Sequence, residues 1–140
     1  MLSRCGVKDY EIVSLISFDI DGTMAFGDPS GRIGVDAVIK AKELGFIVGS
    51  ASDRTLGAQT KHWDNVGVDV DFVSLKHRLL EIKQRFPDGP HLHIGDGDMD
   101  RWFATKAGFD FLWVGDLPTD GSLEWLHAYH RTEVLGQGEI

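Results

Sequence analysis

The stretch Phe18-Asp19-Ile20-Asp21-Gly22-Thr23 decides how the rest of the chain is interpreted. It follows a short apolar run, from Ile12 to Ile16, that predicts a buried strand over about residues 11–18. Two aspartates, separated by a single residue, stand where this strand ends and a Gly-Thr turn begins. Carboxylates at the end of a buried strand lower the stability of the folded protein unless a cation or hydrogen-bond donors compensate their charge. The rest of the sequence should therefore contain their partners.

Length and composition predict one domain and exclude several classes of protein. The chain has 140 residues, the usual size of one domain, and we expect a single domain over 1–140. Its formal charge of -8 argues against broad binding to nucleic acid, which needs clustered Lys and Arg. The single cysteine, Cys5, excludes an intramolecular disulfide and indicates a reducing compartment. Because we find no signal-peptide core or long apolar run, we expect a soluble, cytoplasmic protein.

Strand and helix patterns alternate along the chain. After a glycine-rich loop, further strands are predicted over residues 46–51, 68–73, 91–94 and 109–114. Helices are predicted over about 35–44, 54–65, 75–86 and 98–107, with a last one over 122–131. Asp53, Ser74 and Asp98 are the expected caps of the second, third and fourth helices. The alternation predicts a Rossmann-like α/β sandwich of three layers, with a central parallel sheet of about five strands.

Several polar residues fall at one edge of this predicted sheet. Asp19 and Asp21 end the first strand, Ser52 ends the second, Lys76 follows the third, and Asp96 ends the fourth. Each has an ordinary structural explanation alone, but in parallel α/β sheets the carboxyl ends of the strands form the ligand site. A carboxylate can attack phosphorus when a cation screens the repulsion. The pattern therefore predicts a phosphoryl-transfer site.

The residue types suggest a role for each member of this set. Asp19 is the expected nucleophile and Asp21 the neighbouring acid/base. Ser52 and Lys76 are expected to hold phosphate oxygens, and Asp96 to help hold a metal ion. Mg2+ suits a site of carboxylates, water and substrate phosphate.

These motifs resemble those of the haloacid dehalogenase (HAD) superfamily, in particular its phosphatase branch. The first family motif is matched by Asp19-Ile20-Asp21-Gly22-Thr23, and the second by Ser52 at the end of the next strand. Lys76 matches the third, and Gly95-Asp96-Gly97-Asp98-Met99-Asp100 the fourth. The resemblance extends over about residues 12–115.

The resemblance implies a mechanism and a ligand set. Asp19 forms an aspartyl-phosphate, while Asp21 protonates the leaving oxygen and later activates water. Mg2+ is held by the Asp19 side chain, the Asp21 backbone carbonyl and Asp96, with Asp100 as a ligand or a support for one. Gly22 and Thr23 join the phosphate-binding set of Ser52 and Lys76. The second aspartate favours phosphoryl transfer, because relatives that act on carbon–halogen bonds lack it.

Two positions have competitors. Ser50 is an alternative to Ser52, but the spacing from Gly45 favours Ser52. Lys83 is an alternative to Lys76, but it lies about two helical turns further from the active edge.

Other residues receive structural interpretations. His91 and His93 resemble a metal pair, but they precede the strand end by several residues, which favours core or interface histidines. Asp98 is interpreted as a helix cap and not as a ligand. Trp102, Trp113 and Trp125 are expected in the core.

The connections are too short to carry a cap domain. Only residues 22–34 separate the first motif from the first helix, so we expect an open site with a small flap over residues 24–27. A protein without a cap either accepts a large substrate or borrows a wall from another subunit. The expected partners are thus a phosphorylated small molecule or phosphoprotein, and a second copy of the chain. The alternative is a catalytically weak or inactive HAD-fold module that only binds or regulates.

Overall fold

A parallel sheet of five strands lies at the centre of the computed structural model, which describes residues 15–129. The strands are β2 (Leu15–Phe18), β3 (Ile47–Ser52), β4 (Phe72–Leu75), β5 (His91–Gly95) and β6 (Asp110–Trp113). Their order is β4-β3-β2-β5-β6, and every neighbouring pair is parallel. This confirms the predicted fold class.

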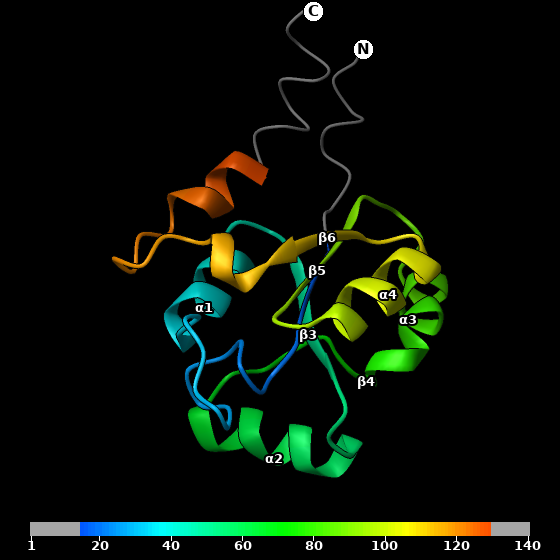
Figure 1. Cartoon of the computed structure of the whole chain (residues 1–140), viewed down its shortest axis with the longest axis horizontal. Helices are drawn as coiled ribbons and strands as arrows, with labels where there is room; N and C mark the ends of the chain where they lie inside the picture. The colour runs from blue at the N-terminus through cyan, green and yellow to red at the C-terminus, as the bar shows by residue number, and fades with distance from the viewer. Residues whose placement is uncertain (1–14, 130–140) are drawn as a thin grey trace, which may run out of the picture.

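Helices cover both faces of the sheet (Figure 1). The α-helices are α1 (Val35–Glu43), α2 (Leu56–Val66), α3 (Leu79–Arg85) and α4 (Asp98–Ala107). Short 3-10 helices, η2 (Lys76–Arg78) and η3 (Val114–Asp116), follow β4 and β6, and residues 124–129 are helical. In Figure 1, α1 and α2 lie on one side of the sheet and α3 and α4 on the other. None of the helices within residues 15–129 has the length and apolar character needed to cross a bilayer.

The core has one part on each side of the sheet. Successive residues of a strand point to opposite faces, so Leu15 packs in the cluster with Leu79 of α3, while Ile16 packs in the cluster with Val38 of α1 and Trp63 of α2. Burial of both faces leaves the ends of the strands as the place for polar side chains.

The predicted cap of α2 was wrong. Thr55 precedes the helix, and its Oγ1 accepts the Ala58 N–H at 3.1 Å. The Asp53 side chain is 85% exposed and its Oδ2 lies 3.7 Å from Lys76 Nζ. Asp53 therefore faces a cation of the site and does not cap the helix.

The third strand was placed too early. β4 begins at Phe72, after Asp71 has paired with Val48: the Val48 N–H donates to Asp71 Oδ2, and the Asp71 N–H donates to the Val48 carbonyl. Ser74 belongs to the strand and caps no helix. The α-helix that follows begins only at Leu79, after η2.

The start of α4 also differs from the prediction. Gly97 is the N-cap residue and Asp98 is the first residue inside the helix. Asp100 takes the capping role: its Oδ2 accepts the N–H groups of Asp96 and Gly97, each at 3.2 Å. Its carboxylate is thereby drawn toward the end of β5.

The tryptophan predictions were partly wrong. Trp102 is 56% exposed on α4, where Lys106 Nζ lies 5.6 Å from its ring centroid. Trp113 and Trp125 are half-buried, whereas Trp63 is the large side chain that fills the core.

Some predictions fall outside the described residues. These are Cys5, residues 11–14 of the first strand and residues 130–131 of the last helix. Residues 22–34, the connection between the first motif and the first helix, carry no inserted domain; residues 19–34 fold back through a bridge between Met24 and Ile33.

Candidate active site

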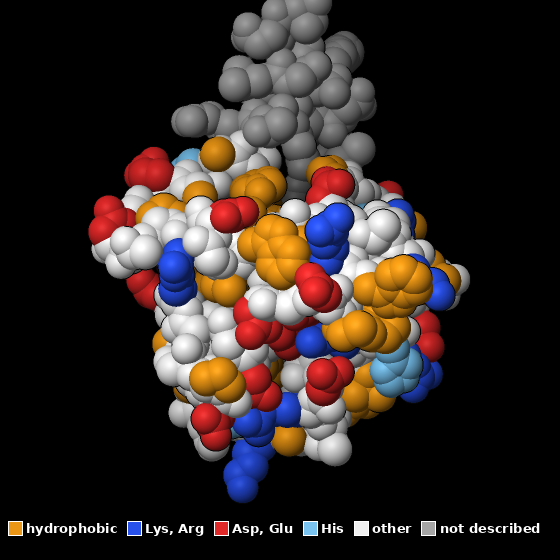
Figure 2. All heavy atoms as spheres, in the orientation of Figure 1, with side chains coloured by type: hydrophobic (Ala, Val, Ile, Leu, Met, Phe, Trp, Pro, Cys, Tyr) orange, Lys and Arg blue, Asp and Glu red, His pale blue; other side chains and the backbone are white. Residues whose placement is uncertain are grey.

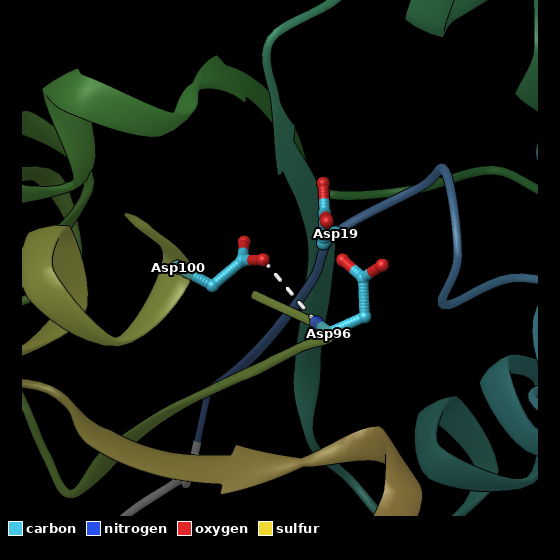
Figure 3. Close-up of side chains that lie close together, drawn as sticks. All are labelled: Asp19, Asp96 and Asp100. Atoms are coloured by element: carbon cyan, nitrogen blue, oxygen red, sulfur yellow. Dashed lines mark hydrogen bonds between the residues drawn. The ribbon is translucent and has the colours of Figure 1, made fainter. Parts of the chain in front are cut away.

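Three carboxylates meet at the carboxyl end of the sheet (Figure 3). Asp19 follows β2, Asp96 follows β5, and Asp100 lies in the first turn of α4. One oxygen from each lies within 4.8 Å of the others. Asp19 and Asp100 are buried and Asp96 is exposed, so the cluster is open on one side. An all-oxygen set of this kind fits a hard divalent cation such as Mg2+.

The pairing of β2 with β5 creates this meeting point. Phe18 is in register with Ile94, and the Asp19 N–H donates to the Ile94 carbonyl at 2.9 Å. The two strands therefore end at the same level. Residues far apart in sequence are brought together, as the carboxyl-edge rule predicts.

The turn after Asp19 is shaped by its glycine. Gly22 has φ +78°, and a Cβ there would lie 2.0 Å from Asp96 Oδ2. Only glycine lets the Asp96 carboxylate lie against this turn. The next residue, Thr23, is buried, and within residues 15–129 its Oγ1 has no hydrogen-bond partner.

Among the described residues, Lys76 is the cation that contacts Asp19. Its Nζ lies 3.5 Å from Asp19 Oδ2 and 3.0 Å from Asp100 Oδ1. Burial alone would lower the pKa of Lys76, but the charges of Asp19 and Asp100 raise it above its usual value. The competing Lys83 instead donates to the Gly108 carbonyl at 2.9 Å. The structure thus brings Lys76, and not Lys83, to the acidic cluster.

A buried histidine supports Asp100 from below. His93 Nε2 lies 2.9 Å from Asp100 Oδ1, and His93 Nδ1 lies 2.9 Å from Ser17 Oγ. Burial lowers the pKa of His93, so the neutral ring donates to Asp100 and accepts from Ser17. Burial works against the charge on Asp100, but His93 and Lys76 hold its pKa at about 2. His93 is a buried core histidine, as predicted, but its link to the site was missed.

Asp19 has the opposite electrostatic environment. Burial, with the charge of Asp100 beside it, raises the pKa of Asp19 to about 8, and Lys76 only partly offsets this. Asp19 therefore holds a proton near neutral pH unless a further cation is present. This is the behaviour expected of a carboxylate placed to share a divalent ion.

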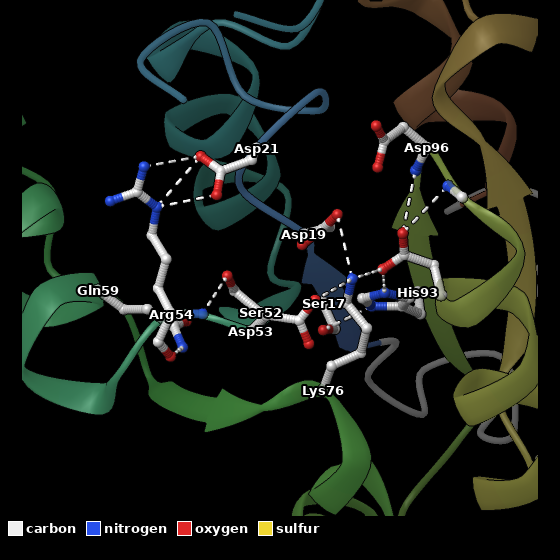
Figure 4. Close-up of polar contacts among 12 residues, drawn as sticks. Ser17, Asp19, Asp21, Ser52, Asp53, Arg54, Gln59, Lys76, His93 and Asp96 are labelled. Atoms are coloured by element: carbon white, nitrogen blue, oxygen red, sulfur yellow. Dashed lines mark hydrogen bonds and ion pairs between the residues drawn. The ribbon is translucent and has the colours of Figure 1, made fainter. Parts of the chain in front are cut away.

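Asp21 lies on the rim of the site and is held by Arg54 (Figure 4). Arg54 Nε lies 2.9 Å from Asp21 Oδ2, Arg54 Nη2 lies 3.0 Å from Oδ1, and the Asp28 N–H donates to Oδ1 at 2.8 Å. Burial would raise the pKa of Asp21, but these hydrogen bonds lower it. The sequence interpretation missed Arg54 as a partner; its position two residues after Ser52 was the available signal.

The two competing serines point to different places. Ser50 donates to Gln59 Oε1 at 2.7 Å and accepts the Trp63 Nε1–H at 2.9 Å, both from α2. Ser52 Oγ accepts the Arg54 N–H at 3.0 Å and lies between Asp19 and Arg54 in Figure 4. Ser52 is thus the serine at the site.

Acidic and basic side chains lie side by side near the middle of the face shown in Figure 2. No protein-family model matches the chain, and no curated protein matches it. The assignment of this site therefore rests on the geometry of its own residues.

Proposed function

We propose that this protein is a Mg2+-dependent phosphomonoester hydrolase of the HAD superfamily that acts through an aspartyl-phosphate. One observation carries the proposal. At the carboxyl edge of a parallel sheet, Asp19 lies in a carboxylate cluster with Asp96 and Asp100, and 3.5 Å from Lys76. A nucleophile, a set of metal ligands and a phosphate-binding cation are thereby combined.

Asp19 and Asp96 would hold the metal ion, with the Asp21 backbone carbonyl and with Asp100 as a ligand or a support for one. The bound ion supplies positive charge that lets a carboxylate approach a phosphate ester. Asp100 is fixed by His93 and by two backbone N–H groups, so its carboxylate has a defined position next to the other metal ligands. Such fixed outer contacts are typical of metal sites.

The reaction would proceed in two displacements. Asp19 Oδ attacks phosphorus, the ester P–O bond breaks, and Asp21 gives a proton to the departing oxygen. Asp21 then takes a proton from water, which attacks the same phosphorus, releases phosphate and restores Asp19. Ser52 and Lys76 would bind the phosphoryl oxygens throughout. The N–H groups of Gly22 and Thr23, the other members of the expected phosphate-binding set, donate in the structure to the carbonyls of Pro29 and Ile20. To serve both steps, Asp21 has to leave Arg54.

The same proposal covers partners and compartment. An open site suits a phosphorylated small molecule or a phosphoprotein, or needs a wall from a second copy of the chain. The single cysteine fits the reducing cytoplasm. The acidic net charge fits a protein that does not bind nucleic acid.

Asp19→Asn tests the nucleophile. Hydrolysis of p-nitrophenyl phosphate with Mg2+ should fall on the order of a thousandfold or more. Asp98→Asn is the matched control, since Asp98 is an exposed carboxylate two residues from Asp96 and lies outside the cluster. It should keep nearly full turnover. Thermal unfolding of both variants checks that they fold. Unchanged turnover in Asp19→Asn would refute the mechanism.

An inactive binding module is the outcome to set against this. A folded wild-type protein that binds Mg2+ yet leaves a broad panel of phosphomonoesters intact would favour that alternative.

A further inference from the structure

Arg54 has a place at the site that the proposed reaction does not use. It lies in the loop between β3 and α2, and its Nε and Nη2 point at the Asp21 carboxylate. Its third nitrogen, Nη1, lies 3.3 Å from His62 Nε2 on α2. Because an arginine only donates, His62 accepts here and steadies the outer end of the guanidinium. The Phe26 ring stacks on His62 at 5.5 Å and holds that ring in turn.

The Arg54–Asp21 pair is placed where it can be exchanged. The Arg54 side chain is 31% exposed and that of Asp21 is 35% exposed. The pair is bidentate, but at this exposure water and dissolved ions reach both partners, so an anion from solution can compete for the guanidinium. The planar guanidinium is suited to carboxylate and phosphate oxygens, which it binds two at a time. The Asp21 carboxylate thus occupies Arg54 in the way that an incoming oxyanion could.

Within residues 15–129, two cations contact acidic residues of the site, and they lie on different sides of it. Lys76 contacts Asp19 and Asp100, where the phosphoryl group would react. Arg54 lies on the far side of Asp21 from Asp19 in the view of Figure 4. Since Asp21 would protonate the departing oxygen, the part of the substrate that leaves has to pass close to Arg54. On a chain of formal charge -8, a local cation is needed to attract a substrate with more than one anionic group.

We propose that Arg54, steadied by His62, is a subsite for a second anionic group, a carboxylate or a phosphate, on the leaving group of the substrate. The proposal rests on the proposed hydrolase function. When the second anion pairs with Arg54, the Asp21 carboxylate is displaced from the guanidinium, takes up a proton from water, and can then give that proton to the departing ester oxygen. Binding of the correct substrate and release of Asp21 are then one event, which favours phosphomonoesters whose leaving group carries a second anionic group over those whose leaving group is uncharged.

The test compares substrates that differ only in this second group. 2-Hydroxyethyl phosphate, whose leaving group is uncharged, is the reference. Phosphoglycolate carries an additional carboxylate, and ethylene glycol bisphosphate carries a second phosphate. For the wild-type protein, kcat/KM for at least one doubly anionic compound should exceed that of the reference by at least about tenfold. In Arg54→Gln this ratio should fall to about one, and Arg54→Lys should retain part of it because the charge remains without the fork.

Lys61→Gln is the control. Lys61 is an exposed residue of α2 beside His62. The substitution therefore removes one positive charge, as Arg54→Gln does, but at a residue outside the site. It should keep the wild-type ratio.

Three results would overturn the subsite. One is equal kcat/KM for all three compounds in the wild-type protein. Another is a preference that survives in Arg54→Gln. The third is an equal loss on every substrate in that variant, which would make Arg54 only a positioning residue for Asp21. These differ from failure of the hydrolase proposal itself, in which neither the three compounds nor p-nitrophenyl phosphate is turned over and the subsite falls with the function.

Discussion

Asp19 and Asp21 are two residues apart in one turn, yet the protein treats them in opposite ways. Asp19 is 3% exposed, and burial with the nearby Asp100 raises its pKa to about 8. Asp21 is on the rim, where the hydrogen bonds of Arg54 overcome partial burial and lower its pKa. The two carboxylates have the same chemistry, so the difference comes wholly from the elements packed around each. Position in the fold, more than residue type, sets the opposite pKa shifts of the two carboxylates.

The buried side of this comparison depends most on Lys76. Lys76→Met leaves Asp100 and Asp19 without their cation, and loss of one partner from a buried ion pair costs about 3–5 kcal/mol. We expect urea unfolding in EDTA to show this loss, together with loss of hydrolysis. Lys83→Met removes a lysine of α3 that donates to the Gly108 carbonyl, and should cost about 1 kcal/mol. Equal losses in the two variants would contradict a special role for Lys76.

A substitution of His93 tests whether its hydrogen bond fixes the buried Asp100 carboxylate. His93→Leu removes the hydrogen bonds to Asp100 and Ser17, and we expect a loss of about 1–3 kcal/mol. The Mg2+ concentration for half-maximal hydrolysis should rise about tenfold or more, because Asp100 is no longer fixed. His91→Leu is the control: His91 is buried on the same strand but contacts the Phe86 carbonyl. It should lose stability without a change in the Mg2+ requirement.

Gly22 follows Asp21 in sequence and also lies against the Asp96 carboxylate of the metal-ligand cluster. Gly22→Ala should cost about 1–2 kcal/mol for its left-handed backbone and should weaken Mg2+ binding by displacing Asp96. Gly45→Ala isolates the backbone cost, because Gly45 also has a positive φ, +97°, but nothing lies within 4 Å of an added Cβ. If thermal unfolding and Mg2+ titrations show the same behaviour for both variants, the close approach of Asp96 is unimportant.

The raised pKa of Asp19 predicts how stability depends on pH without metal. The folded protein keeps the Asp19 proton up to about pH 8, whereas the unfolded chain loses it near its ordinary value of 3.8. Between these values the folded state binds more protons, so its free energy of unfolding falls as pH rises, by at most about 1.4 kcal/mol per pH unit. The lowered pKa of Asp100 acts in the opposite sense, but only at more acidic pH.

Denaturant unfolding in EDTA at several pH values measures this slope, and Asp19→Asn should remove the contribution of Asp19. Calorimetry near pH 7 in buffers of different ionisation enthalpy should show that Mg2+ binding releases about one proton from the wild-type protein and none from the variant. Proton release that is the same in both proteins would assign the raised pKa to another group.

Much of the fold was predictable because its signals are local. Apolar runs and glycine-marked helix ends identified the five strands and the alternation of strands with helices. The errors occurred where tertiary contacts compete with local preference. Asp71 pairs with Val48 and delays β4, and Thr55 replaces Asp53 as the cap of α2. The core prediction for Trp102, which is exposed, failed because hydrophobic character alone does not tell which face of α4 meets the sheet.

The sequence by itself determined the parallel α/β fold and which carboxylates stand at strand ends, because periodicity and turn residues act over a few positions. Only the tertiary structure decided how Asp19 and Asp21 differ. It placed Asp100, Lys76 and His93 around the first and Arg54 beside the second, from elements distant in sequence. Burial and charge act through space, so the environment of a carboxylate exists only once these elements have packed.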